Sequence, residues 1–175
     1  FPKKKSRLIK KGDLVMIDVW ARLNKKNAPF ADITWVAYSG RKVPAKIMRI
    51  FKKVIHARDL GILNIKKSLR KRKFPNVKNV DEEVRNSFGR LKNKFLHRTG
   101  HSLGLKKCHG KEFSIYFKED KKINPNIPLT IEPGLYFKKK FGIRSEIDCY
   151  ISQNYKLIIT TDIQRNIILI FYCII

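Results

Sequence analysis

The stretch DLVMIDVWARLNKKNAPFADITWVAYSG, residues 13–40, decides the fold class because it contains two strand-like runs joined by a turn. Residues 13–23 and 30–40 are rich in β-branched and aromatic side chains, which favour strands. The segment NKKNAP between them carries the Asn and Pro typical of turns. The stretch therefore predicts a β-hairpin, and each of its strands holds one acid among apolar neighbours, Asp18 and Asp32.

Two helices are predicted after this hairpin. From Pro44, a good first helical residue, apolar side chains recur at helical spacing toward Ile62. A basic connector, KKSLRKRKFPN at 66–76, then leads to VDEEVRNSFGRLKNKF at 80–95, which predicts a second helix with acids in its first turn.

The rest of the chain reads as further strands, namely PLTIEPGLYF (128–137), GIRSEIDCYI (142–151) and KLIITTDI (156–163). Strands, two helices and then more strands indicate an α+β fold, an antiparallel sheet backed by helices. With 175 residues, we expect a single domain over 1–175.

The formal charge of +26, from 40 basic and 14 acidic residues, suggests nucleic acid as a partner. The lysines are spread over the whole chain, however, and they accompany an excess of Ile and Asn, which is typical of biased codon composition. We therefore expect nonspecific, salt-sensitive binding to polyanions rather than a dedicated nucleic-acid function.

Location is predicted from apolar runs and cysteines. No stretch reaches the roughly 18 apolar residues of a membrane span, which predicts a soluble protein with no membrane partner. Three scattered cysteines without a C-x-x-C pair favour a reducing compartment, the cytoplasm. The chain starts at Phe1 rather than Met and lacks a signal-peptide core, so a fragment is compatible with the sequence.

Four acids lie in strand-like segments: Asp18, Asp32, Glu132 in LTIEPG and Glu146 in IRSEID. Each could point outward from a half-exposed strand, but a buried carboxylate must be paired, hydrogen-bonded or bound to a metal. Together with His101 in FLHRTGHSLG (95–104), they form a donor set suited to Mn²⁺, Co²⁺ or Zn²⁺. Four carboxylates suit two ions that share ligands, and such a pair supports metal-assisted hydrolysis.

Five motifs occur in one order: GDLVMIDVWA, ADITW, HRTGHSLG, TIEPGLY and GIRSEID. In these motifs the chain resembles the pita-bread metallopeptidases, the creatinase and methionine-aminopeptidase superfamily (family M24). The branch of aminopeptidase P and Xaa-Pro dipeptidase is the most similar. The resemblance implies a pita-bread fold, a curved antiparallel sheet backed by helices. Since the family's catalytic domain begins further upstream, it also implies that the N-terminal portion of that domain is lacking.

The resemblance also implies roles for single residues. Two divalent ions, Mn²⁺ first and Co²⁺ or Zn²⁺ as alternatives, would be bound by Asp18, Asp32, His101, Glu132 and Glu146. Glu132 would act as general base and acid, and His109 would hold the scissile carbonyl or the oxyanion. Arg144 would hold a metal-binding carboxylate in place, while His97 would lie near the metals without touching them, or be purely structural.

The function implied is a dinuclear-metal aminopeptidase or dipeptidase that hydrolyses the N-terminal peptide bond, with proline at the second position of the peptide. A homodimer is compatible with the sequence. One alternative is a binding module of the same fold for ribosomes, RNA or histones, and another is an inactive fragment. The presence of all five metal-binding residues favours the enzyme. Without the upstream half, we expect the 175-residue chain alone to turn over peptides slowly or not at all.

Overall fold

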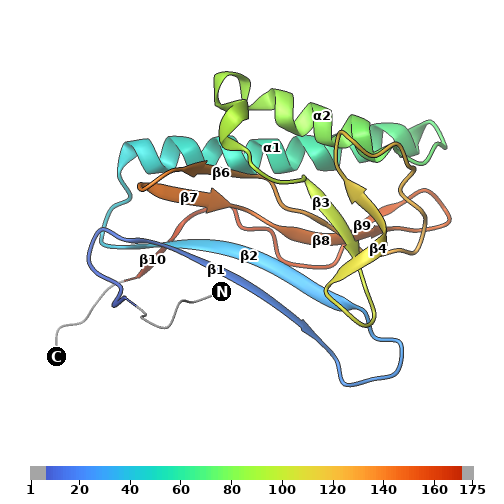
Figure 1. The fold of residues 1–175 in the computed structure, drawn as a ribbon, viewed down its shortest axis with the longest axis horizontal. Coiled ribbons are helices and arrows are strands. Elements are labelled where there is room, and N and C mark those ends of the chain that lie inside the picture. Colours follow the sequence, from blue (N-terminus) through green and yellow to red (C-terminus); the bar gives the residue numbers. More distant parts are fainter. Residues whose placement is uncertain (1–6, 171–175) are drawn as a thin grey trace.

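Residues 7–170 are described by a computed structural model, with two helices packed on one side of curved β-structure (Figure 1). The elements in order are β1 (Leu14–Arg22), β2 (Phe30–Ser39), α1 (Ala45–Arg70), α2 (Val77–Ser87), the 3₁₀ helix η1 (Gly89–Lys94), β3 (Gly100–Leu103), β4 (His109–Ile115), β5 (Leu129–Ile131), β6 (Gly134–Phe137), β7 (Phe141–Arg144), β8 (Ile147–Ile151), β9 (Leu157–Ile159) and β10 (Ile168–Ile170). The predicted α+β class is confirmed.

The predicted hairpin is present as β1 and β2, which pair antiparallel from Leu14 opposite Tyr38 to Arg22 opposite Phe30. The segment NKKNAP lies in the turn between them. β2 is the central strand of a three-stranded sheet and β1 is its edge, so most of β1 is exposed. The hairpin extends away from the helices in Figure 1.

The remaining strands form a five-stranded sheet in the order β4-β3-β5-β8-β9 and a separate hairpin of β6 and β7. All of these pairs are antiparallel, as predicted, but β10 pairs with β2 in parallel. The segment before β10 is fixed by Gln164. Its side-chain amide accepts from the Val36 N–H at 2.9 Å and donates to the Val36 carbonyl at 2.6 Å, as a neighbouring strand would.

Helix α1 continues to Arg70, so the prediction of a connector starting at residue 66 was wrong. Ile65 and Leu69 extend the apolar stripe by two more turns and are buried. Lys and Arg are good helix formers, and cations are favourable at the carboxyl end of a helix. The basic residues of 66–70 therefore lie on the solvent side of α1 and do not end the helix.

The second helix is shorter than predicted. It begins after Asn76, whose side chain accepts from the Lys78 N–H, and ends at Ser87, where η1 follows. The acids consequently lie beyond its first turn, which contradicts the predicted dipole role. Asp81 is buried instead, and it accepts from the Thr99 backbone N–H and hydroxyl and from the Arg85 guanidinium. Asp81 thus fixes the segment that leads into β3.

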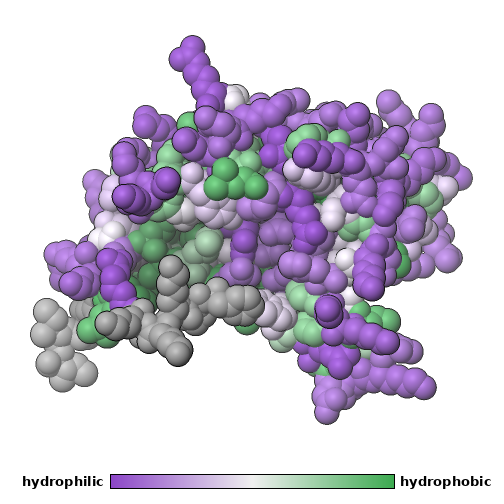
Figure 2. Space-filling model, viewed as in Figure 1, coloured by the Kyte–Doolittle hydropathy of each residue, from purple (hydrophilic) through white to green (hydrophobic). Residues whose placement is uncertain are grey.

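Two apolar clusters lie between the helices and the strands. One joins the second half of α1 to the five-stranded sheet through residues such as Ile65, Ile131 and Ile147. The other joins the first half of α1 to β2, β6 and β7 through Phe51, Val54 and Leu135. Hydrophilic side chains cover most of the outer face over the helices (Figure 2). Within residues 7–170, no helix has the length and apolar character needed to cross a membrane.

Candidate metal centre

The eight residues predicted for the site line a single cavity of about 550 Å³ between the hairpin and the five-stranded sheet. They are Asp18 on β1, Asp32 on β2, His97 before β3, His101 on β3, His109 on β4, Glu132 after β5, Arg144 on β7 and Glu146 before β8. Residues up to 128 positions apart in sequence are therefore brought to one place by strand pairing.

Asp18 and Asp32 reach the cavity from the same face of the hairpin. Asp18 lies opposite Thr34, and Asp32 is two residues before Thr34 on β2. Because side chains on a strand alternate between faces, this offset points both carboxylates the same way. Asp32 is buried, whereas Asp18 at the edge is exposed.

Glu132 and Glu146 do not lie inside strands as predicted, but at two breaks in the strands. Pro133 follows Glu132, has no N–H to donate, and ends β5. Ile131 pairs with Ile147, so the residue after one and the residue before the other are neighbours. The Glu146 backbone N–H donates to the Thr34 carbonyl at 3.2 Å, which attaches this break to β2.

His101 presents an unprotonated nitrogen to the carboxylates. Its Nδ1 lies 2.9 Å from the Ser102 carbonyl oxygen, which only accepts, so Nδ1 carries the hydrogen. Burial lowers the pKa of His101 to about 4, which keeps the ring neutral at pH 7. Nε2 therefore directs a lone pair toward Asp32 Oδ2 at 3.7 Å and Glu132 Oε1 at 3.6 Å. Lone pairs that converge in this way repel one another unless a cation or a proton lies between them.

The donor atoms group into three overlapping triads, each with its atoms within 4.8 Å of one another. They are Asp18 with Asp32 and Glu146, His101 with Glu132 and Glu146, and Asp32 with His101 and His109. Asp32, His101 and Glu146 each belong to two triads. Shared carboxylates between neighbouring triads are the arrangement that two adjacent divalent ions require.

Burial raises the pKa of Asp32, Glu132 and Glu146 above the usual carboxyl range, and repulsion among the site's carboxylates acts in the same direction. One oxygen of Asp32 and one of Glu146 are buried without a hydrogen-bond partner in the described part of the chain. Unpartnered buried carboxylate oxygens are costly. Oxygen donors with one neutral imidazole fit Mn²⁺, Co²⁺ or Zn²⁺, so the residues present fit divalent ions.

Arg144 is the main positive group among these acids. It forms an ion pair with Asp18, donates from Nε to Thr34 Oγ1 at 2.9 Å, and lies 3.9 Å from Glu132 Oε2. Burial opposes its charge, but Tyr136 and the surrounding carboxylates raise its pKa, so it remains a cation. Arg144 thus contacts a predicted metal-binding carboxylate, and it compensates only part of the negative charge.

His97 has no nitrogen left for a metal. Its Nδ1 donates to the Arg98 carbonyl at 2.8 Å, so Nε2 accepts from the Tyr136 hydroxyl at 2.8 Å. Its ring also packs edge-on against Phe95 and Tyr136. These contacts agree with a histidine that supports the cavity wall.

His109 and Cys108 close the outer side of the cavity. The ring of exposed His109 lies 4.3 Å from that of His101, centroid to centroid. The Cys108 thiol donates to Asp32 Oδ2 at 3.1 Å, and burial and the adjacent carboxylate raise its pKa. The segment 105–108 separates His109 from β3 as a loop and leaves its ring at the cavity.

Sequence reasoning missed two supporting residues. The Thr34 hydroxyl donates to Glu146 Oε2 at 2.6 Å, and it also accepts from Arg144. Asp148 accepts from the Asp32 backbone N–H at 2.8 Å, and burial raises its pKa to about 7. Asp148 gave a signal, since it is a fifth acid within a strand-like run, whereas a single Thr in ADITW gives none.

Comparisons with known proteins agree with this geometry. The sequence profile of metallopeptidase family M24 matches residues 1–153. The chain is 28% identical to an Xaa-Pro dipeptidase of Pyrococcus furiosus over 146 residues, which are 83% of this chain and 39% of the relative. It is 29% identical to an uncharacterized peptidase of Bacillus subtilis over 163 residues, 93% of this chain and 43% of the relative.

Among solved structures, an X-Pro aminopeptidase from Thermotoga maritima superimposes with a TM-score of 0.79 and 27% identity. The match covers 93% of this chain and 43% of that one. The chain thus spans less than half the length of these relatives, and the fold is the pita-bread fold that the motifs implied.

Proposed function

Because this chain belongs to metallopeptidase family M24, we propose that it is the metal-binding part of an aminopeptidase or dipeptidase that cleaves the N-terminal peptide bond before proline. The single observation that carries the proposal is the convergence of His101 Nε2 with the carboxylates of Asp32 and Glu132. The Xaa-Pro preference rests on the similarity to the Xaa-Pro dipeptidase of Pyrococcus furiosus and the X-Pro aminopeptidase of Thermotoga maritima. We assign residues 1–175 to one catalytic domain.

We assign the ligands by the triads. Asp18, Asp32 and Glu146 would hold one ion, His101, Glu132 and Glu146 the other, and Asp32 also lies close enough to His101 to be shared. Two divalent ions bound there would polarise the scissile carbonyl and generate a nucleophile from water near neutral pH. We name Mn²⁺ as the first choice, with Co²⁺ and Zn²⁺ as alternatives, because the donors are mainly oxygen.

The chain's own residues would move the protons and hold the substrate. Glu132 would accept a proton from the attacking water and return it to the leaving amine. His109, which lines the same cavity, would donate a hydrogen bond to the developing oxyanion. Arg144 would keep Asp18 oriented toward the ions, through the ion pair described above.

The cellular setting belongs to the same proposal. Cys108 and Cys149 are free in the described part of the chain, which suits a reducing compartment, and we place the enzyme in the cytoplasm. The natural substrate would be a peptide with proline at its second position. A homodimer is compatible with this assignment.

The test is calorimetric titration with Mn²⁺, which reports binding whether or not this chain turns over substrate. We expect two bound ions per chain, and Asp32→Asn or Glu146→Gln should lower the affinity at least a hundredfold, since each removes a shared ligand. Asp162→Asn, at an exposed position outside the cavity, is the matched control and should bind as the wild type does. Unchanged titrations for both site variants would rule out the dinuclear assignment.

Substrate preference needs a second assay. A proline-containing dipeptide and its alanine counterpart should be compared with Mn²⁺ present, using Glu132→Gln as the blank. Only slow turnover is expected from these 175 residues, because productive attack needs the substrate held from several sides. Preference for the alanine peptide would contradict the Xaa-Pro assignment while leaving the metal site intact.

A further inference from the structure

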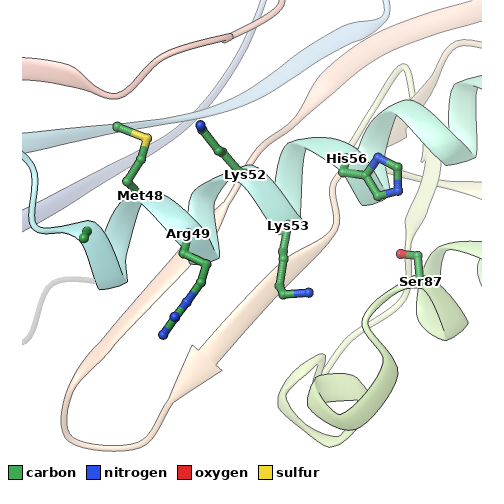
Figure 3. A pocket seen from close by; sticks show the side chains of 7 residues that line it. Met48, Arg49, Lys52, Lys53, His56 and Ser87 are labelled. Carbon is green, nitrogen blue, oxygen red and sulfur yellow. The ribbon is translucent and has the colours of Figure 1, made fainter.

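The outer face of α1 carries a second hollow, remote from the cavity of the acids. It has a volume of about 550 Å³ and lies along the first half of α1 against the end of α2. Its lining consists of Ala45, Met48, Arg49, Lys52, Lys53, His56 and Ser87. Figure 3 shows Arg49 and Lys53 on the same side of α1, with His56 facing Ser87. We call this hollow the α1 groove.

The α1 groove is basic because two acid-free segments meet there. The sequence has no acid between Asp32 and Asp59, and none between Glu83 and Glu112. These segments supply the first half of α1 and the turn after α2, which holds Arg90 and other cations. The cations of the groove therefore have no acidic neighbour close in sequence.

The cations of the groove are exposed and uncompensated. Arg49, Lys52 and Lys53 form no ion pair with any carboxylate in residues 7–170, whereas at the other end of α1 Lys67 lies 3.9 Å from Glu83. Helix neighbours three and four positions apart lie about 5–6 Å from each other. At 1.5 Å per residue, the row from Arg49 to His56 is about 10 Å long. The three cations along this row can each neutralise one phosphate.

We propose that the α1 groove binds the phosphodiester backbone of a single-stranded nucleic acid without preference for base sequence. A serial polyanion is the ligand that a row of uncompensated cations recognises. Apart from the His56 imidazole the groove offers no aromatic ring, and its cations would contact phosphates, which carry no sequence information, so sequence preference is not expected.

A protein partner fits the groove less well. Of its lining residues only Ala45 and Met48 are apolar, and neither is an aromatic or branched aliphatic anchor of the kind that dominates protein interfaces. The Ser87 hydroxyl already donates to the Val84 carbonyl at 2.6 Å, so the side-chain donors directed at a ligand are the cations and His56. These donors favour an anionic ligand.

The experiment compares two triple variants of the whole chain with the same loss of charge. Arg49, Lys52 and Lys53 are changed to Gln in one, and Arg70, Lys71 and Lys73 in the other. The second set lies at the far end of α1 and just beyond it, and its nearest member, Arg70, is about 26 Å from Lys53 by helical rise. Binding is followed by fluorescence anisotropy with a labelled single-stranded RNA 20-mer of mixed sequence, at several salt concentrations. Circular dichroism and urea unfolding confirm that both variants fold.

We expect the groove variant to bind RNA at least tenfold more weakly than the wild type at moderate salt. Its slope of log affinity against log salt should fall by about 2, since each phosphate contact contributes about 0.7. The far-end variant should lose less than threefold. Equal losses would mean that only net charge matters, and a larger loss at the far end would place binding elsewhere. Either result overturns the proposal, as would tighter binding to a polyglutamate peptide than to RNA.

Discussion

At the scale of single residues, the partner of Nε2 decides which histidine can bind a metal. His97 and His101 are four residues apart, and each donates from Nδ1 to a backbone carbonyl. The difference lies at Nε2, which accepts from Tyr136 in His97 but faces two carboxylates in His101. The sequence FLHRTGHSLG does not distinguish them, because the partners come from distant segments.

His97 should make stability depend on pH. Burial lowers its pKa to about 4, from about 6.5 in an unfolded chain. A base whose pKa is lowered by folding contributes stability above its unfolded pKa, and this contribution is lost as the pH falls from 6.5 toward 4. The free energy of unfolding of the wild type, minus that of His97→Gln, should therefore fall by at most about 1.4 kcal/mol per pH unit in this window.

Urea unfolding at half-unit steps from pH 4 to 8 measures this difference. Above pH 7 this difference in unfolding free energy should not change with pH. Tyr136→Phe supplies the control. It removes the hydroxyl that donates to the neutral His97 ring, so the pH range over which the stability difference changes should become narrower. A wild type and His97→Gln with parallel pH profiles would show that His97 is protonated as easily in the folded protein as in the unfolded one.

At the scale of elements, β3 depends on a close approach of two backbones at Gly100. A Cβ built at Gly100 would lie 2.0 Å from the Thr130 carbonyl oxygen, a backbone atom that cannot turn aside. At Gly61 on α1, by contrast, an added Cβ would meet methyl groups of Val84, Ile131 and Val80, at 3.1, 3.3 and 3.9 Å. The two glycines therefore differ in how much they tolerate.

Gly100→Ala should destabilise the protein by about 2 kcal/mol or more, since it pushes β3 away from β5. Gly61→Ala should change the stability by less than about 1 kcal/mol, because the gain in helix propensity offsets the tight contact. The midpoints of urea unfolding at constant m-value give both numbers. Equal effects of the two substitutions would contradict the close approach.

Some strands and helices could be predicted from the sequence and others could not, and the difference has physical reasons. Strand-like composition predicted β1 and β2, and helical spacing predicted the start of α1, because both signals are local. The end of α1 was missed because a run of cations reads equally as a loop or as the solvent side of a helix. The parallel β10 was also missed, since its register depends on Gln164 and Val36, whose side chain and backbone meet only in the fold.

The eight residues predicted for the site line one cavity, although Glu132 and Glu146 lie at strand breaks rather than inside strands. Motif order could group these residues because the motifs include the breaks. Their roles in metal binding and catalysis stay predictions. Thr34 was beyond the reach of sequence analysis and the acid Asp148 was overlooked, because both act through hydrogen bonds between residues more than a hundred positions apart.

At the scale of the whole molecule, the buried carboxylates of the site should lower stability when no cation is bound. Buried Glu146 repels Glu132 and Asp32 when no cation is present. Glu146→Gln keeps an oxygen that can accept from Thr34 and removes one negative charge. We expect it to raise the free energy of unfolding in chelator by about 1–2 kcal/mol at pH 8. The metal-dependent rise in melting temperature should disappear in the same variant.

Differential scanning fluorimetry with and without Mn²⁺ follows both the stability in chelator and the metal-dependent rise in melting temperature. Asp162→Asn, which removes a charge outside the cavity, should change neither value by more than the variation between replicate measurements. A Glu146→Gln protein that is less stable than the wild type in chelator would mean that Glu146 is well compensated by Arg144 and Thr34 alone.

The Gln164 side chain that imitates a strand beside Val36 also has a consequence for protein synthesis. The two residues are 128 positions apart, so at 5–20 residues per second a ribosome needs between about 6 and 26 s to deliver the second after the first. Throughout that interval the Val36 amide and the edge of β2 lack the Gln164 side chain as a hydrogen-bond partner. The nascent hairpin is therefore the part of this chain that a chaperone would have to shield, and codons that slow translation between the two residues would lengthen its exposure.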